Sequence, residues 1–112
     1  MRVLVLEDNP ERQEVFRKLF PGCRVVSTYA GAVAALEEPR FDEVWLDFDI
    51  EFGFNGADVA FFMANQPRDK WPDRAVVHSS NVRGSLAIFV TLRKAGLNVE
   101  QRPYPPVLAV TG

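Results

Sequence analysis

The chain has 112 residues, of which 47% are hydrophobic and 12% are aromatic. That length suits one ordinary domain and the composition supplies a sizeable core, so two domains and a generally disordered chain are both excluded. The formal net charge of −2 gives no overall attraction to nucleic acid or to an anionic membrane.

The chain has a single cysteine, Cys23, so it cannot form an intrachain disulfide. Cys23 opens an apolar run, which favours a buried structural thiol over a nucleophile. No apolar stretch is long enough for a membrane span, and the first residues begin a strand-like pattern without the basic region of a signal peptide. We therefore expect a soluble protein of the cytoplasm, without a membrane partner.

The hydrophobic pattern alternates between short continuous apolar runs, typical of buried parallel strands, and longer segments with helical spacing. Asp8 or Asn9 can cap a helix that has Pro10 in its first turn. Proline and glycine end the helical segments. In chain order the pattern predicts strands at 2–7, 23–28, 41–47, 74–79 and 97–102, and helices at 10–20, 30–38, 56–65 and 82–95.

This alternation predicts an α/β fold, a doubly wound five-stranded parallel sheet with right-handed crossovers and helices on both faces. The tail contains three prolines and leaves too few residues after them for a fifth helix. We expect a domain over residues 1–103 and an extended tail over 104–112. Apolar surface on the last strand and the last helix would then stay uncovered, which indicates homodimerisation through that face.

Polar side chains follow the predicted strands, and the carboxyl ends of parallel strands meet at one edge of a sheet. Asp8, Asp47 and Asp49 are expected to converge there, and like charges so close need a cation among them. Oxygen ligands suit Mg²⁺ or Mn²⁺, which would share a phosphate ligand. The side chains able to hold or protonate that phosphate are His78, Ser79, Asn81 and Arg102.

Each of these residues also has an ordinary structural explanation. The alternatives are a helix cap for Asp8, a surface or supporting acid for Glu7, a solvent-facing loop residue for Asp49, a satisfied core histidine for His78, a helix cap for Ser80 or Asn81, and a surface ion pair with Glu100 or Glu11 for Arg102. Their joint position at one edge is what favours a functional site.

The order of elements and the acids after the first and third strands resemble the receiver domain of two-component response regulators, from residue 1 to about residue 103. The matching positions are Glu7, Asp8, Asp47, Ser79 and Arg102-Pro103. The resemblance implies the strand order 2-1-3-4-5, Mg²⁺ at the acids and a phosphoacceptor role for Asp47. The chain departs from that family because Arg102 replaces a lysine and no fifth helix is expected.

The sequence resembles more closely a divergent receiver-like family, the cyclic-phosphate-processing receiver domains. The matching positions are Asp8, Arg12, Asp47, Asp49, Gly56, His78, Ser79, Asn81 and Gly84. Phe48 stands where that family usually has a histidine. The resemblance implies a phosphodiesterase that hydrolyses a cyclic phosphate.

Three functions remain open. The first is a metal-dependent phosphate-processing enzyme, in which His78 protonates the leaving oxygen of a small phosphate-containing molecule or a nucleic-acid end. The second is a signalling receiver phosphorylated on Asp47, with Arg102 in place of the lysine. The third is an inactive receiver-like scaffold that binds a partner.

Overall fold

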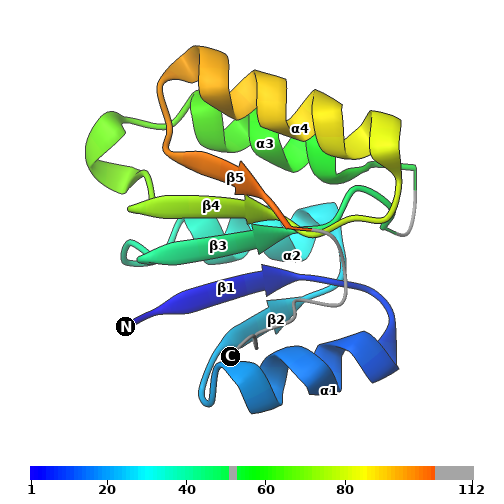
Figure 1. The fold of residues 1–112 in the computed structure, drawn as a ribbon. Helices are drawn as coiled ribbons and strands as arrows, with labels where there is room; N and C mark the ends of the chain where they lie inside the picture. The colour runs from blue at the N-terminus through cyan, green and yellow to red at the C-terminus, as the bar shows by residue number, and fades with distance from the viewer. Residues whose placement is uncertain (51–52, 103–112) are drawn as a thin grey trace, which may run out of the picture.

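A five-stranded parallel sheet with helices on both faces forms the domain, in a computed structural model that describes residues 1–50 and 53–102 (Figure 1). The strand order is β2-β1-β3-β4-β5, which confirms the predicted α/β fold. In chain order the elements are β1 (Val3–Leu6), α1 (Pro10–Leu19), β2 (Arg24–Val26), α2 (Tyr29–Leu36), β3 (Glu43–Leu46), α3 (Gly56–Ala64), the short 3₁₀ helix η1 (Arg68–Lys70), β4 (Arg74–Val77), α4 (Val82–Ala95) and β5 (Val99–Gln101).

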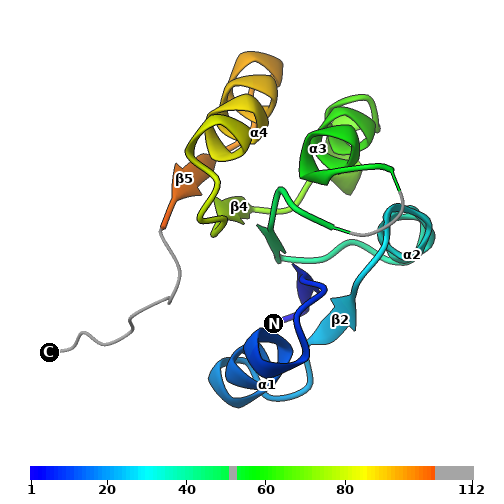
Figure 2. The same ribbon diagram turned by 90° about the vertical axis from the view of Figure 1, so that its right-hand side faces the viewer.

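Side-chain caps fix where the four α-helices begin. Asn9, Thr28, Asn55 and Asn81 each accept hydrogen bonds from backbone N–H groups in the first turn of the helix that follows. Gly96 ends α4 in the left-handed conformation, with φ 108°, which costs glycine little. Because every capped helix follows a strand, all four helix N-termini lie at the carboxyl edge of the sheet, the edge that Figure 2 views.

The two faces of the sheet are covered unequally. Helices α2, α3 and α4 pack on one face (Figure 2), where side chains such as Leu46, Val59 and Ile88 form the larger core. On the other face α1 supplies Phe16, which packs with Val76 and Trp45. Both sets of side chains are buried, and their hydrophobic burial is the main term that stabilises the sheet between its two layers.

Beyond α1, charged residues line the second face. Arg74 on β4 bridges Glu43 on β3 and Glu100 on β5, at 2.8 and 2.5 Å, and Glu43 accepts a hydrogen bond from the Trp45 indole. The sequence predicted uncovered apolar surface on the last strand. The part of this face near β5 is therefore more polar than expected. On α4, the last predicted helix, apolar side chains are exposed as expected, at Val82, Leu86 and Val90.

The predicted tail conformation falls on residues 103–112, which lie outside the described residues. Nothing among the described helices combines the length and apolar character needed to cross a membrane.

Candidate functional site

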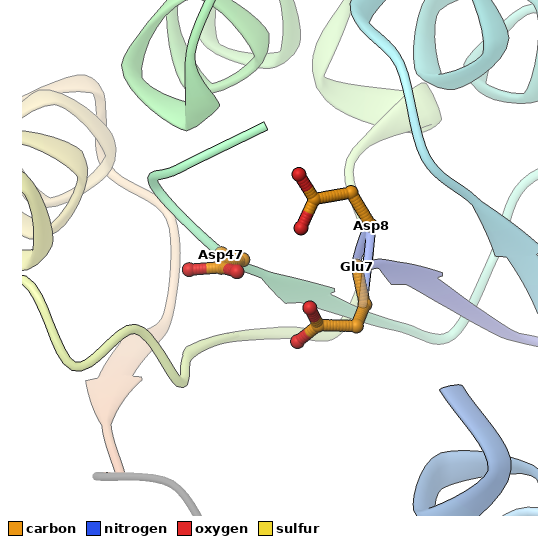
Figure 3. A group of neighbouring side chains, drawn as sticks. All are labelled: Glu7, Asp8 and Asp47. Atoms are coloured by element: carbon orange, nitrogen blue, oxygen red, sulfur yellow. The ribbon is translucent and has the colours of Figure 1, made fainter. Parts of the chain in front are cut away.

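Three carboxylates meet at the carboxyl edge of the sheet (Figure 3). Glu7 and Asp8 directly follow β1, and Asp47 directly follows β3; these strands are neighbours, with Leu6 paired to Leu46. One oxygen from each carboxylate lies within 4.8 Å of the other two. Glu7 is fully buried and Asp47 is almost so, whereas Asp8 is half-buried. The arrangement therefore offers three oxygen ligands at the rim of the sheet.

Backbone contacts on both sides hold Glu7 in place. Its N–H donates to the carbonyl of Val26 at 2.9 Å, and its carbonyl accepts from the Gln13 side chain at 2.7 Å. The Asn9 N–H donates to Glu7 Oε2 at 3.0 Å. The other carboxylate oxygen, Oε1, is buried and has no hydrogen-bond partner among the described residues. A buried acceptor left this way is costly, and a bound cation would satisfy it.

The electrostatics of the cluster favour a cation as well. Burial raises the pKa of Glu7 to about 7, helped by the nearby Asp47 charge and opposed by the Asn9 N–H and by Arg12. Burial also raises the pKa of Asp47, although a hydrogen bond from the Ser79 hydroxyl opposes that shift. Carboxylates that resist ionisation together bind a hard divalent cation with oxygen ligands, because the cation removes their repulsion. The donor set fits Mg²⁺ or Mn²⁺.

The neighbouring strands β3 and β4 bring Ser79 next to Asp47 at their carboxyl ends. Ser79 is buried, and its Oγ accepts a hydrogen bond from the Asn81 N–H at 3.0 Å. The hydroxyl proton is therefore available to the Asp47 carboxylate. The Asn81 side chain accepts from the Gly84 N–H at 2.8 Å, so it acts as the helix cap that the sequence left open as an alternative.

Two glycines lie in close contact with Asp47 and Phe48. A Cβ on Gly56 would lie 2.0 Å from the Asp47 carbonyl oxygen, and a Cβ on Gly84 would lie 2.1 Å from the Phe48 ring. The Gly56 N–H also donates to the Phe48 carbonyl at 2.8 Å. Phe48, which replaces a histidine of the resembling family, is thus packed against the first turn of α4.

His78 lies deeper than the sequence suggested. Its ring has no exposed surface and packs on Phe16, with ring centroids 4.7 Å apart. Nε2 lies 3.2 Å from the Leu6 carbonyl, to which it must donate, and Nδ1 lies 3.7 Å from Glu7 Oε1. Burial lowers the pKa of His78 to about 4, so the ring is neutral near pH 7. The position of His78 matches the structural alternative given for it above, a histidine in the core, and its ring lies next to the Glu7 carboxylate.

Two predicted site residues are not brought into the carboxylate cluster. Asp49 is exposed in the loop after Asp47, because the chain has already left the sheet there. Arg102 is exposed and donates to Glu100 at 3.2 Å, which is the surface ion pair weighed as its alternative. Roles for Asp49 as a metal ligand and for Arg102 at a phosphate stay predictions.

Sequence reasoning undervalued Glu7 and Arg12. Glu7 follows a four-residue buried strand and still pairs with β2 through its N–H, and this register keeps its side chain inside. Arg12, in the first turn of α1, lies near enough to lower the pKa values of Glu7, Asp47 and His78. The sequence did offer a signal for Arg12, because this residue follows Glu7 and Asp8 by about one helical turn in a helix that begins directly after them.

Solved structures share this fold at low sequence identity. The phosphorylated cyanobacterial phytochrome response regulator RcpA is 17% identical, with a TM-score of 0.71 over 88% of this chain and 76% of that one. A CheY-like receiver domain from Methylobacillus flagellatus is 16% identical, with a TM-score of 0.71 over 94% and 86%. The receiver domain of a sensor histidine kinase from Pseudomonas aeruginosa, with a magnesium ion in its active site cleft, is 22% identical, with a TM-score of 0.70 over 93% and 84%.

No curated protein matches the sequence significantly. The family profile described as the cyclic-phosphate processing receiver domain matches residues 2–94, which span both strands that carry the acids and the whole of the β4–α4 connection. The chain therefore belongs to the family of cyclic-phosphate processing receiver domains.

Proposed function

We propose that this domain binds a divalent cation, Mg²⁺ or Mn²⁺, through Glu7, Asp8 and Asp47, and that it handles a phosphate group there. The observation that carries the proposal is the convergence of the Glu7, Asp8 and Asp47 carboxylates, which each bring one oxygen within 4.8 Å of the other two. The buried Glu7 Oε1, which has no hydrogen-bond partner among the described residues, supports it. A cation at this point would neutralise the cluster and polarise an oxygen of the phosphate. The magnesium ion of the Pseudomonas aeruginosa receiver domain supports the choice of metal.

The phosphate would lie on the open side of the cluster, next to Asp8 and Asp47. The Ser79 hydroxyl, whose single proton is directed to Asp47, could turn and donate to a phosphate oxygen once the cation neutralises Asp47. Arg12 supplies the positive charge that the sequence assigned to Arg102, since its guanidinium affects Glu7 and Asp47 from the first turn of α1.

The first candidate reaction is hydrolysis of a cyclic phosphate, for which the family name is the support. Water adds to phosphorus, one ring P–O bond breaks, and the leaving oxygen takes up a proton. His78 was the predicted donor of that proton. Its buried ring and lowered pKa weaken that role, because a donor must reach the leaving oxygen and carry a proton near neutral pH.

The second candidate reaction is transfer of a phosphoryl group to Asp47. The contact between the Asp47 carboxylate and the Ser79 hydroxyl favours it, as does the lack of an exposed imidazole at the described cluster. RcpA, one of the similar structures, is phosphorylated. Both candidate reactions need the same cation and the same three carboxylates.

One set of measurements tests the shared site and then separates the reactions. Calorimetry with Mn²⁺ should show binding to the wild type, and its absence would leave an inactive scaffold. Turnover of a 2′,3′-cyclic phosphate, lost in Asp47→Asn, would support hydrolysis. A phosphate adduct on Asp47 after treatment with acetyl phosphate, detected by mass spectrometry, would support the signalling receiver instead.

The His78→Ala variant adds a sharper test of the hydrolytic reaction. If His78 donates the proton, its loss should lower turnover by roughly 10²–10⁴-fold while the affinity for Mn²⁺ changes little. A melting curve recorded in parallel shows whether the variant is folded. Unchanged turnover in folded His78→Ala would exclude the histidine as the donor.

A further inference from the structure

Two aromatic rings stack on each other at the carboxyl edge of the sheet, the edge that also holds the carboxylate cluster. Tyr29 begins α2 and Phe54 immediately precedes the cap of α3; their ring centroids are 4.4 Å apart and their planes are 16° from parallel. Tyr29 is half-buried against the larger core, whereas Phe54 is 51% exposed. The Tyr29 ring therefore supports one face of Phe54 from within the protein, and Phe54 presents aromatic surface to solvent.

Both aromatic residues are close in the chain to backbone groups that contact Glu7 or Asp47. Tyr29 is three residues beyond Val26, whose carbonyl accepts the Glu7 N–H at 2.9 Å. Phe54 is two residues before Gly56, which is in close contact with the Asp47 carbonyl. An extended chain spans at most about 3.6 Å per residue. The Cα atom of Tyr29 therefore lies within about 11 Å of the Val26 Cα, and the Cα atom of Phe54 lies within about 7 Å of the Gly56 Cα.

The connections also place the rings on the rim that holds the carboxylates. The N-termini of α2 and α3 both lie at the carboxyl edge of the sheet (Figure 2). A ligand whose phosphate lies at Asp8 and Asp47 would extend across this rim. In a nucleotide the sugar connects the phosphate to the base, so the base lies away from the phosphate and could reach a ring on the same rim.

We propose that Phe54, supported by Tyr29, is the surface on which the base of a nucleoside phosphate stacks while its phosphate lies at the metal site. This inference rests on the proposed function and names its substrate class. Every nucleobase has an aromatic face, so stacking on Phe54 selects a nucleotide over a simple phosphate or sugar phosphate without selecting one base. Stacking of one base on one aromatic ring strengthens binding by roughly 5- to 150-fold.

The test compares three ligands on the Mn²⁺-loaded protein, namely inorganic phosphate, ribose 5-phosphate and adenosine 5′-monophosphate. We expect the nucleotide to bind at least about fivefold more tightly than ribose 5-phosphate. Phe54→Ala should remove that difference and leave ribose 5-phosphate binding unchanged, whereas Phe54→Trp should preserve it. The matched control is Phe61→Ala, since Phe61 is an exposed phenylalanine within α3, 66% exposed, and it should retain the wild-type difference.

The outcomes separate this inference from the function on which it rests. Equal affinities for the nucleotide and ribose 5-phosphate in the wild type, or an unchanged preference in Phe54→Ala, would overturn the stacking surface alone. Failure of all three ligands to bind would refute the phosphate site and the stacking surface together. Equal losses in Phe54→Ala and Phe61→Ala would assign the effect to general hydrophobicity and would also overturn the proposal.

Discussion

Replacing Glu7 by glutamine should change how the stability of the domain depends on pH. The pKa of Glu7 rises from 4.5 to about 7 on folding, so the folded state holds this proton more tightly than the unfolded state does. The contribution of Glu7 to the free energy of unfolding is then greatest below pH 4.5 and is lost as pH rises to about 7. A shift of this size corresponds to about 3 kcal/mol.

His78 acts in the opposite direction over nearly the same range. Its pKa falls from 6.5 to about 4 on folding, so its contribution is greatest above pH 6.5 and is lost as pH falls toward 4. The size is again about 3 kcal/mol. In the wild type, the contributions of Glu7 and His78 to the free energy of unfolding change with pH in opposite directions and offset each other. Glu7→Gln removes the Glu7 contribution, so between pH 4.5 and 7 the free energy of unfolding of the variant should rise by about 3 kcal/mol relative to that of the wild type.

Urea unfolding between pH 4 and 8, with a chelator present, measures both slopes. At pH 8 the metal-free Glu7→Gln variant should exceed the wild type by about 3 kcal/mol, because it removes a buried charge. Saturating Mn²⁺ should then stabilise the wild type more than the variant. Glu11→Gln, an exposed acid in the first turn of α1, is the control and should follow the wild type. A variant less stable than the wild type at pH 8 would refute the reasoning.

Four further outcomes are expected. Asp47→Asn should weaken Mn²⁺ binding in calorimetry by at least about tenfold, or about 1.4 kcal/mol, whereas Asp49→Asn, outside the cluster, should change it little; equal losses would restore Asp49 as a ligand. Mn²⁺ affinity of the wild type should fall by up to about tenfold per unit as pH drops below 7, because the cation must displace the proton from Glu7, and a flat profile would contradict this. Gly56→Ala should lower the melting temperature, since its Cβ would meet the Asp47 carbonyl; unchanged melting would show that the loop yields. Homodimerisation stays a prediction: light scattering at high micromolar concentration should detect a dimer that Leu86→Glu dissociates, and a strict monomer would count against it.

The fold was predictable because buried parallel strands and amphipathic helices leave different patterns in the sequence. Short continuous apolar runs such as 3–6 are typical of central parallel strands, and their alternation with helices leaves few topologies. The proximity of the Asp8 and Asp47 carboxylates was predictable from the same topology, since both residues follow neighbouring strands.

The depth of individual side chains was harder to predict. His78 shares its side of β4 with Arg74 and Val76, so alternation could have placed it on the face that α1 covers, but the sequence does not show that Phe16 closes over it. Asp49 follows Asp47 with strand-like spacing, and nothing in the residues reveals that the chain leaves the sheet between them. The sequence also does not show that Arg102 pairs with Glu100.

The short outer strands have a consequence for aggregation. β2 and β5 each have three residues, and each carries charge in an ion pair: Arg24 with Glu38, and Glu100 with Arg74 and Arg102. Short, charged edges discourage another chain from adding a strand to the sheet. Self-association of this domain should therefore involve side chains of α4 and leave the sheet edges free, so that a dimer can form without growing into a fibre.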